Sequence, residues 1–371
     1  MNRLRELDFL RGIAIILVLL RHIPLFSLFQ NMGWIGVDLF FVLSGFLVSG
    51  LLFKEYIKYG NIKPKLFLIR RGYKIYPIYY LFYIPYLLFI LYKTHFDLIG
   101  FLSDMTFTQN YIHGWGYAYG ASWSLAVEEH FYFGLTLMLW LVIKYKKIKL
   151  EKISNKQFSI NSFETLVVFI MFLSILLRLV FNLLFPEKYD EVRLFTTTQF
   201  RIDSLLMGVL ISYFYYFRLK DLATMFNKYK CKLLVVSILG IVWTPFIDPV
   251  PSIFVKTIGF TILYISFGII LVFFLMQKDI NQLLNKFLTP TLVNSVSRIG
   301  FCSYSIYIIH SFVIKICYLI IKNHQIFSIV TNKYSFFLLA STLSILIGMF
   351  MTYKIEKYFL KLRNVYYPSR V

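Results

Sequence analysis

The 371-residue chain has few charged residues, and acidic residues are the scarcest of them. Only 15% of its residues are Asp, Glu, Lys or Arg, whereas 58% are hydrophobic and 20% are aromatic. Soluble domains typically have about 25% charged and about 45–50% apolar residues, so this composition excludes an ordinary soluble protein. It predicts an all-α protein that crosses a membrane several times.

Cysteines are also few. The chain has three, Cys231, Cys302 and Cys317, with no CxxC pair and no neighbouring metal-ligand residues, so the sequence indicates neither a disulfide nor a metal site. The amino-terminal segment has two arginines ahead of an apolar run, as a signal peptide does, but no small-residue cleavage site follows. We therefore expect residues 7–26 to be retained as the first helix.

Ten apolar runs each have about the 20 residues that a helix needs to cross a bilayer. No connection is as long as a separate soluble domain, and no internal repeat or pair of broken helices typical of many transporters is evident. We expect a single membrane-embedded domain over residues 1–371 with no appended soluble domain. The predicted spans are 7–26, 34–53, 75–92, 123–143, 163–185, 199–217, 232–247, 252–276, 299–321 and 335–353.

Lys and Arg are distributed unevenly over the connections. Residues 54–74 and 144–162 contain seven and six of them, whereas residues 93–122 contain one. Cytoplasmic connections of membrane proteins are enriched in Lys and Arg, so we predict that both termini and these two basic connections are cytoplasmic. This asymmetry also explains the net charge of +21, and nucleic acid is not an expected partner.

Most ionisable residues within the predicted spans lie in their outer halves. Ionisable side chains are costly in hydrocarbon, and a group of them from five helices is expected around one water-accessible cavity. A set of interhelical ion pairs is the structural alternative. The group consists of His22, Asp38, Glu128, Glu129, Arg178, Arg201 and Asp203.

The first span, "DFLRGIAIILVLLRH", holds an arginine and a histidine on one helix face. Arg11 and His22 are eleven residues apart, and eleven steps of about 100° return to nearly the same face. At about 1.5 Å per residue they are separated by roughly 16 Å along the axis. This face can engage an anionic donor near its inner end and present a base near its outer end. Ordinary interfacial placement of both residues is the alternative.

A second basic feature is "FLIRRGYKIYPIYY", where Arg70, Arg71 and Lys74 precede the third span. Arg71 and Lys74 are one helical turn apart, so both can approach one phosphate. Attraction to lipid headgroups is the alternative. The outer segment "TQNYIHGWGYAYGASWS" is rich in Tyr and Trp, which stack on sugars but also populate membrane interfaces.

Six motifs in this order resemble the acyltransferase 3 family of membrane O-acyltransferases, which modify sugars and lipid-linked glycans. The resemblance covers most of the chain. The motifs are Arg11 and His22 with ten residues between them, "GVDLFFVLSGFLVSG" (36–50), "RRGYKIYP" (70–77), "SWSLAVEEHFY" (122–132), "RIDSLLMG" (201–208) and "SRIGFCSYSIYIIH" (297–310).

The resemblance implies that His22 is catalytic and that Arg11 is its partner. The family's second motif usually has two arginines one turn apart, whereas here Lys74 takes the second position. Lysine attracts a phosphate but lacks the fork geometry of arginine, so bidentate recognition is in doubt. Tyr358 also replaces the proline that often follows the glutamate–lysine pair near the C-terminus, a departure that we interpret as peripheral.

The leading hypothesis is transfer of an acyl group, acetyl being favoured, from cytosolic acyl-CoA to a hydroxyl of a cell-surface or lipid-linked sugar. His22 is expected to remove the acceptor proton and Glu128 or Glu129 to orient its ring; an acyl-histidine intermediate is the other chemical route. Arg11, Arg70, Arg71 and Lys74 are expected to bind the donor. The remaining candidates, acceptor-side or structural, are Asp38, Ser122, Trp123, Arg178, Arg201, Asp203 and His310.

Acyl-CoA is expected to act as a co-substrate, with no tightly bound cofactor and no metal. The expected partners are the sugar or glycan acceptor and the lipid bilayer of the inner (plasma) membrane, and the sequence leaves a homo-oligomer open. Two other functions remain open at this point. One is a transporter or flippase for a glycolipid or polysaccharide precursor, and the other is a non-catalytic membrane partner or sensor.

Overall fold

The structure, a computed structural model, describes residues 4–23, 27–93, 96–145, 163–184, 191–323 and 333–371. Every regular element in these ranges is helical, as the apolar composition predicted. Eight helical segments are long and apolar enough to cross a membrane. The chain is therefore an all-α, multi-pass membrane protein.

The helices follow one another with short connections. The longer ones are α1 (Arg5–His22), α3 (Ile35–Tyr59), α4 (Pro64–Lys93), α7 (Trp123–Tyr145), α8 (Phe163–Leu184), α10 (Ile202–Phe217), α11 (Leu219–Val242), α12 (Phe260–Met276), α14 (Pro290–Phe301), α15 (Ser303–Asn323) and α16 (Lys333–Phe350). The shorter ones are α2 (Ser27–Met32), α5 (Leu98–Met105), α6 (Gln109–Ile112), α9 (Glu191–Thr196), α13 (Ile280–Phe287) and α17 (Lys357–Tyr366), the 3₁₀ turns η1 (Gly120–Ser122), η2 (Thr198–Phe200) and η3 (Thr244–Phe246), and the π-helical segments η4 (Val255–Gly259) and η6 (Met351–Glu356).

A helix corresponds to each of the ten predicted spans, but several boundaries differ. The helix α4 begins at Pro64 rather than at residue 75, and α11 begins at Leu219 rather than at residue 232. The predicted spans stopped at charged residues, whereas Lys and Arg are good helix formers and the helices continue through them. The predicted span 299–321 is α15, which α14 precedes across a break at Cys302.

The count of ten spans stays a prediction. The helices α1 and α10 are not among the eight apolar segments, because α1 is rich in charge and α10 has only 16 residues. Residues 24–26 of the first predicted span, residue 185 of the fifth and most of the basic connection 144–162 lie outside the described residues.

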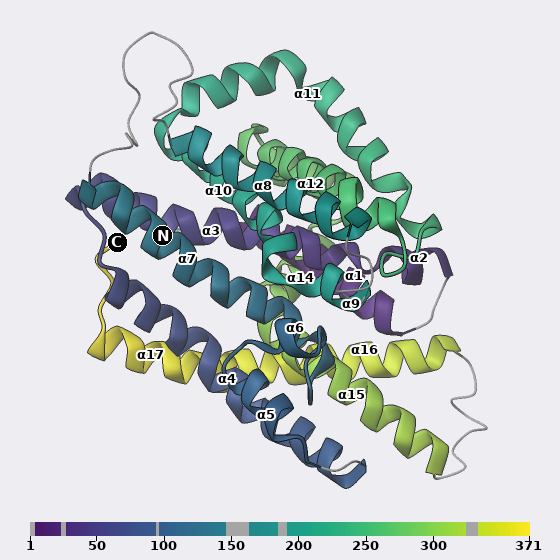
Figure 1. Cartoon of the computed structure of the whole chain (residues 1–371). Helices are drawn as coiled ribbons and strands as arrows, with labels where there is room; N and C mark the ends of the chain where they lie inside the picture. The colour runs from purple at the N-terminus through teal and green to yellow at the C-terminus, as the bar shows by residue number, and fades with distance from the viewer. Residues whose placement is uncertain (1–3, 24–26, 94–95, 146–162, 185–190, 324–332) are drawn as a thin grey trace.

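Helices α1 and α3 run through the middle of the bundle between two groups of helices (Figure 1). On one side α10 packs against α3, α8, α11 and α12, and on the other α15 packs against α4 and α16. The N and C marks lie toward the same end of the bundle (Figure 1). That both termini are cytoplasmic stays a prediction. This arrangement places the face of α1 that carries Arg11 and His22 at the centre.

Glycines allow two of the central helices to approach closely. A methyl group on Gly45 of α3 would overlap the carbonyl oxygen of Leu205, and one on Gly208 of α10 would overlap that of Val42. Small residues of this kind are how membrane helices gain van der Waals contact without a hydrophobic driving force between them. The pair Gly45 and Gly208 therefore fixes α3 against α10.

Candidate active site

Three cavities follow one another along the bundle. The basic cavity, of about 570 Å³, is formed by α3, α4 and residues 363–371. The central cavity, of about 110 Å³, lies among α1, α3, α4, α7 and α15. The histidine cavity, of about 440 Å³, is lined by His22 and by several aromatic side chains.

Neighbouring cavities share walls. Arg71 and Lys74 line both the basic and the central cavity. Val37 and Tyr307 line both the central and the histidine cavity. The three cavities therefore adjoin in series, with basic side chains at one end and His22 at the other.

His22 is the last residue of α1, and its side chain is exposed to the histidine cavity. Its Nδ1 atom lies 2.9 Å from the carbonyl oxygen of Val18. A carbonyl oxygen only accepts hydrogen bonds, so Nδ1 carries the proton in the neutral ring and Nε2 keeps its lone pair. The helix itself thus holds His22 in the tautomer that a general base requires.

His310, on α15, packs against the ring of His22. The ring centroids are 4.9 Å apart in an edge-to-face arrangement. Its Nδ1 atom lies 2.6 Å from the Tyr307 carbonyl oxygen, and its Nε2 atom lies 3.1 Å from the Ser311 hydroxyl. By the same argument Nδ1–H donates to Tyr307 and the hydroxyl of Ser311 donates to Nε2. His310 is fully buried and fully bonded, and it supports the ring of His22 from behind.

The two glutamates of α7 form hydrogen bonds with residues other than His22. Glu128 lines the central cavity and accepts hydrogen bonds from Ser44 (2.7 Å) and Tyr132 (2.6 Å). Glu129 accepts one from Tyr76 at 2.9 Å. The expectation that one of them orients the His22 ring does not agree with these contacts, since the Val18 carbonyl orients it. Sequence spacing within each helix could not reveal which cavity each glutamate faces.

Two of the predicted donor-binding arginines lie on the central cavity. Arg11 donates to Ser303 Oγ at 3.0 Å and lies 3.8 Å from the carboxylate of Asp8. Arg71 donates to the Tyr132 hydroxyl at 2.6 Å, which in turn donates to Glu128. Arg11 and Arg71 therefore line one cavity although they are 60 residues apart, and their role in binding the donor stays a prediction.

Lys74, at the junction of the basic and central cavities, pairs with Glu356, to which the sequence analysis assigned no role. Its Nζ atom lies 3.8 Å from Oε1 of Glu356, and Ser305 donates to Oε2 of the same carboxylate at 3.4 Å. Glu356 ends the π-helical segment η6, a geometry that is frequent at functional sites. Glu356 lies beyond the predicted span 335–353, and its place in the glutamate–lysine pair near the C-terminus was the available signal.

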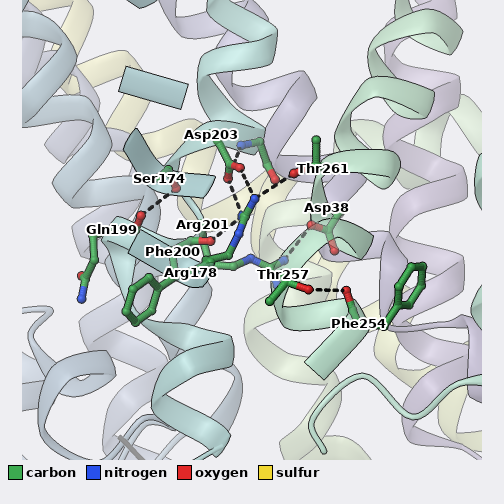
Figure 2. A network of polar contacts seen from close by, with 11 residues as sticks. Asp38, Ser174, Arg178, Gln199, Phe200, Arg201, Asp203, Phe254, Thr257 and Thr261 are labelled. Atoms are coloured by element: carbon green, nitrogen blue, oxygen red, sulfur yellow. Dashed lines mark hydrogen bonds and ion pairs between the residues drawn. The ribbon is translucent and has the colours of Figure 1, made fainter. Parts of the chain in front are cut away.

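Four of the residues expected around one common cavity form a separate network of ion pairs, shown in Figure 2. Arg178 bonds to Asp203 through two nitrogens, at 2.7 and 3.1 Å, and Arg201 bonds to Asp38 at 2.7 Å. All four side chains are 0% exposed. None of them lines the three cavities. The prediction of a single shared cavity is therefore wrong for these four, and the alternative of interhelical ion pairs holds for them.

Aromatic rings surround Arg201 and connect the network to the histidine cavity. The guanidinium carbon lies 3.7 Å from the centroid of the Phe260 ring, 5.0 Å from that of Phe195 and 5.5 Å from that of Trp123. Such cation–π contacts stabilise a charge that water cannot reach. Trp123 and Phe195 also line the histidine cavity. The ion-pair network thus supports the cavity wall from outside it.

The segment before α7 forms another part of that wall. Ser122 accepts hydrogen bonds from Gln109 at both its backbone oxygen and its hydroxyl, each at 3.0 Å, and is fully buried. It holds in place the neighbouring Gly120 and Ala121, which line the histidine cavity together with Trp115. Ser122 is therefore a structural residue of the cavity rim.

Asp104, on α5, anchors the same segment. Its carboxylate accepts hydrogen bonds from the backbone N–H groups of Tyr117 and Ala118 and from the Tyr83 hydroxyl, at 2.9–3.0 Å. Burial raises the pKa of Asp104 to about 6, although these hydrogen bonds act in the opposite direction. The sequence analysis did not single out this residue, because it lies in a connection between spans.

Two further residues at the junctions were missed. Tyr307, shared by two cavities, makes a 2.7 Å hydrogen bond with the Ser124 hydroxyl and donates to the Ala121 carbonyl at 2.9 Å. Arg363 lines the basic cavity. Tyr307 lies within the motif "SRIGFCSYSIYIIH", so the motif was the available signal, whereas nothing in the sequence around Arg363 indicated its place.

Fold and cavities together define a multi-pass membrane protein with three adjoining cavities, of which one is lined by basic side chains and another by His22. The chain belongs to the acyltransferase 3 family, whose acyltransferase domain model matches residues 4–354. No solved structure matches it.

Curated relatives agree with this assignment. The chain is 28% identical over 238 residues to a protein of Staphylococcus aureus (strain COL) that is named as a proposed O-acetyltransferase, with 60% of this chain and 36% of the relative covered. It is 26% identical over 223 residues to the peptidoglycan O-acetyltransferase OatA of Listeria monocytogenes, with 56% and 33% covered. It is also 26% identical over 221 residues to the O-acetyltransferase OatA of Staphylococcus aureus (strain NCTC 8325), with 56% and 34% covered. The alignments thus span about a third of the length of these relatives.

Proposed function

We propose that this protein transfers an acetyl group from acetyl-CoA, bound at the basic cavity, to a sugar hydroxyl bound at the histidine cavity. The observation that carries the proposal is the series of three adjoining cavities, linked through Arg71 and Lys74 at one junction and Tyr307 at the other. Acyl-CoA is a long, narrow molecule with its phosphates at one end and its thioester at the other. Such a donor suits a route that is basic at one end and leads to a base at the other.

The proposed chemistry is a direct acyl transfer. The acceptor hydroxyl oxygen attacks the thioester carbonyl carbon while Nε2 of His22 takes the hydroxyl proton. The new C–O bond forms, the C–S bond breaks, and the imidazolium returns its proton to the departing CoA sulfur. CoA leaves as the thiol and His22 is neutral again. His310 keeps the His22 ring in position but touches neither reactant in this scheme, because its own nitrogens are bonded to Tyr307 and Ser311.

The lining of the histidine cavity supports a sugar as the acceptor. Trp34, Trp115 and Trp123 lie on its walls, and aromatic rings give large, rigid contact areas with polar edges. The names of the two OatA relatives specify O-acetyltransferases, one of them acting on peptidoglycan. We therefore propose a cell-surface or lipid-linked glycan as the acceptor and acetyl as the acyl group.

The test is a transfer assay on the purified protein in lipid nanodiscs. Acetyl-CoA labelled in the acetyl group is supplied with soluble peptidoglycan fragments, and the products are analysed by mass spectrometry. The proposal expects a mass increase of one acetyl group on the sugar and release of one free CoA thiol for each acetyl transferred. Binding of the fragments without thiol release above a protein-free control would contradict it and would favour transport of the glycan.

A further inference from the structure

The basic cavity contains three arginines that form no ion pair with a carboxylate among the described residues. Arg70 donates to the Tyr367 carbonyl and the Asn364 amide oxygen, Arg71 donates to the Tyr132 hydroxyl, and Arg363 donates to Asn364. All of these acceptors are uncharged, and the three arginines are half-buried. Like charges held together away from bulk water are unfavourable unless an anion joins them.

Asn364 brings two of these charges close together. Its Oδ1 atom accepts from Arg70 Nη2 at 3.3 Å and from Arg363 Nη2 at 3.1 Å. One guanidinium group of α4 and one of α17 therefore donate to the same amide oxygen. Each guanidinium has five N–H donors, so both keep donors for a further acceptor.

The one carboxylate side chain on the wall of this cavity is already neutralised. Glu55 bonds to Arg370 and accepts a hydrogen bond from the backbone N–H of Lys63 at 3.1 Å. Lys74 is likewise paired with Glu356. The remaining positive charge is thus concentrated on Arg70, Arg71 and Arg363, which matches a ligand with several negative charges.

From these contacts we infer that Arg363 and Arg70 together bind a phosphate group of the CoA nucleotide, so that α17 forms half of the donor site. The inference rests on the proposed function for the identity of the donor. A phosphate accepts two forked arginines at once and satisfies their free N–H groups. Arg71 and Lys74 then connect this phosphate site to the central cavity, through which the pantetheine arm reaches the thioester position. Helix α17 thereby makes the enzyme select a nucleotide-bearing donor.

A donor that lacks the nucleotide isolates this role. Acetyl-CoA is compared with S-acetyl-pantetheine, which has the thioester but no phosphate, on the wild-type protein and on Arg363→Gln. Loss of a charged hydrogen bond of this kind raises KM about 10- to 100-fold, and we expect that rise for acetyl-CoA alone. The value of kcat, and kcat/KM for S-acetyl-pantetheine, should stay as in the wild type.

Two matched variants complete the comparison. Lys361→Gln removes a positive charge from an exposed position of the same helix, outside the basic cavity. It should leave the KM for both donors unchanged. Arg363→Lys keeps the charge without the fork and should give an intermediate KM for acetyl-CoA. If Arg363→Gln lowered kcat/KM equally for both donors, or for neither, the inference would be overturned.

A binding measurement on the wild-type protein avoids dependence on variant folding. Hydrogen–deuterium exchange of residues 357–371 is measured in nanodiscs with adenosine 3′,5′-bisphosphate, and adenosine serves as the control. We expect protection by the bisphosphate only. Absence of protection by the bisphosphate would reject the inference. Complete loss of the protection when anionic phospholipid replaces zwitterionic lipid would assign the arginines to a lipid headgroup and would also reject it. Protection without any acetyl transfer would instead reject the proposed function and leave the phosphate site standing.

Discussion

In the proposed reaction, the role of His22 as the base depends on one local hydrogen bond and one ring contact. The carbonyl of Val18 fixes its tautomer, and His310 packs edge-on against its ring. The two glutamates of α7 belong instead to the central cavity and to Tyr76. The His22 ring is thus held in position by its own helix and by α15.

His22→Gln tests this role. Glutamine keeps a hydrogen-bonding side chain but cannot take up a proton, so the rate of transfer should fall by about 10²- to 10⁴-fold, nearly as far as in His22→Ala. The rate is measured as thiol release with matched expression and thermal stability. His130→Gln is the control, because His130 lies outside the three cavities and bonds to Thr198. Transfer by His22→Gln at close to the wild-type rate would make His22 a structural residue.

Lys74 stands where the family's second arginine is expected, and its ion pair with Glu356 shows that the position remains basic and oriented. Lys74→Arg should preserve the KM for acetyl-CoA or lower it, because arginine adds a fork to the same charge. Lys74→Met, which keeps the length without the charge, should raise that KM. Steady-state kinetics at saturating acceptor measures both, and a higher KM in Lys74→Arg than in Lys74→Met would contradict the role.

Asp104 gives a pH dependence of stability. Its folded-state pKa is raised to about 6 by burial, above the value of about 4 in an unfolded chain. Its contribution to stability is therefore complete below about pH 4 and is lost as the pH rises to about 6. This difference between the folded and unfolded pKa values corresponds to roughly 3 kcal/mol in the free energy of unfolding.

The melting temperature of the wild type should fall from pH 4 to pH 7 by more than that of Asp104→Asn, which cannot ionise. Scanning fluorimetry in detergent measures the two curves, and Asp248→Asn, at an exposed position of another connection, should behave like the wild type. If the melting temperatures of the wild type and Asp104→Asn changed in parallel with pH, the raised pKa of Asp104 would be contradicted.

At the scale of helices, close contact between α3 and α10 supports the wall that carries the ion-pair network. Gly208→Ala should destabilise the protein by about 1–3 kcal/mol, because the new methyl group meets the backbone of α3. Gly134→Ala on α7 is the matched control, since open space surrounds its position, and it should be neutral or slightly stabilising. Thermal unfolding compares the two, and equal melting temperatures would contradict the packing.

The positions of most helices could be predicted from the sequence, whereas the contacts between helices could not. Apolar runs located every longer helix except α14, because crossing a bilayer imposes a length that the sequence shows directly. Helix starts such as Pro64 were missed because charged residues can continue a helix beyond the hydrocarbon. Contacts such as Lys74 with Glu356 or Arg70 with Asn364 join residues far apart in the chain. No periodicity within one helix contains that information, which is why Glu356 and Arg363 were not anticipated.

At the scale of the whole molecule, α17 and the C-terminal end of the chain lie toward one end of the bundle, and α2, which packs against α1, lies toward the other (Figure 1). Residues of α17 and of the C-terminal end line the basic cavity, and His22 at the end of α1 lines the histidine cavity. Residues 54–74, several of which line the basic cavity, contain seven Lys and Arg, as is typical of the cytoplasmic side. The central claim is therefore that donor and acceptor are used from opposite faces of the membrane, with the acetyl group passing between them inside the bundle.

Proteoliposomes test that claim most directly. The protein is reconstituted with its C-terminus facing outward, peptidoglycan fragments are trapped inside the vesicles, and labelled acetyl-CoA is added outside. The account predicts labelled acetyl on the trapped sugar, at a rate that falls at least about 10²-fold in His22→Gln. Acetylation only when the donor and the sugar are on the same side of the vesicle membrane would contradict it.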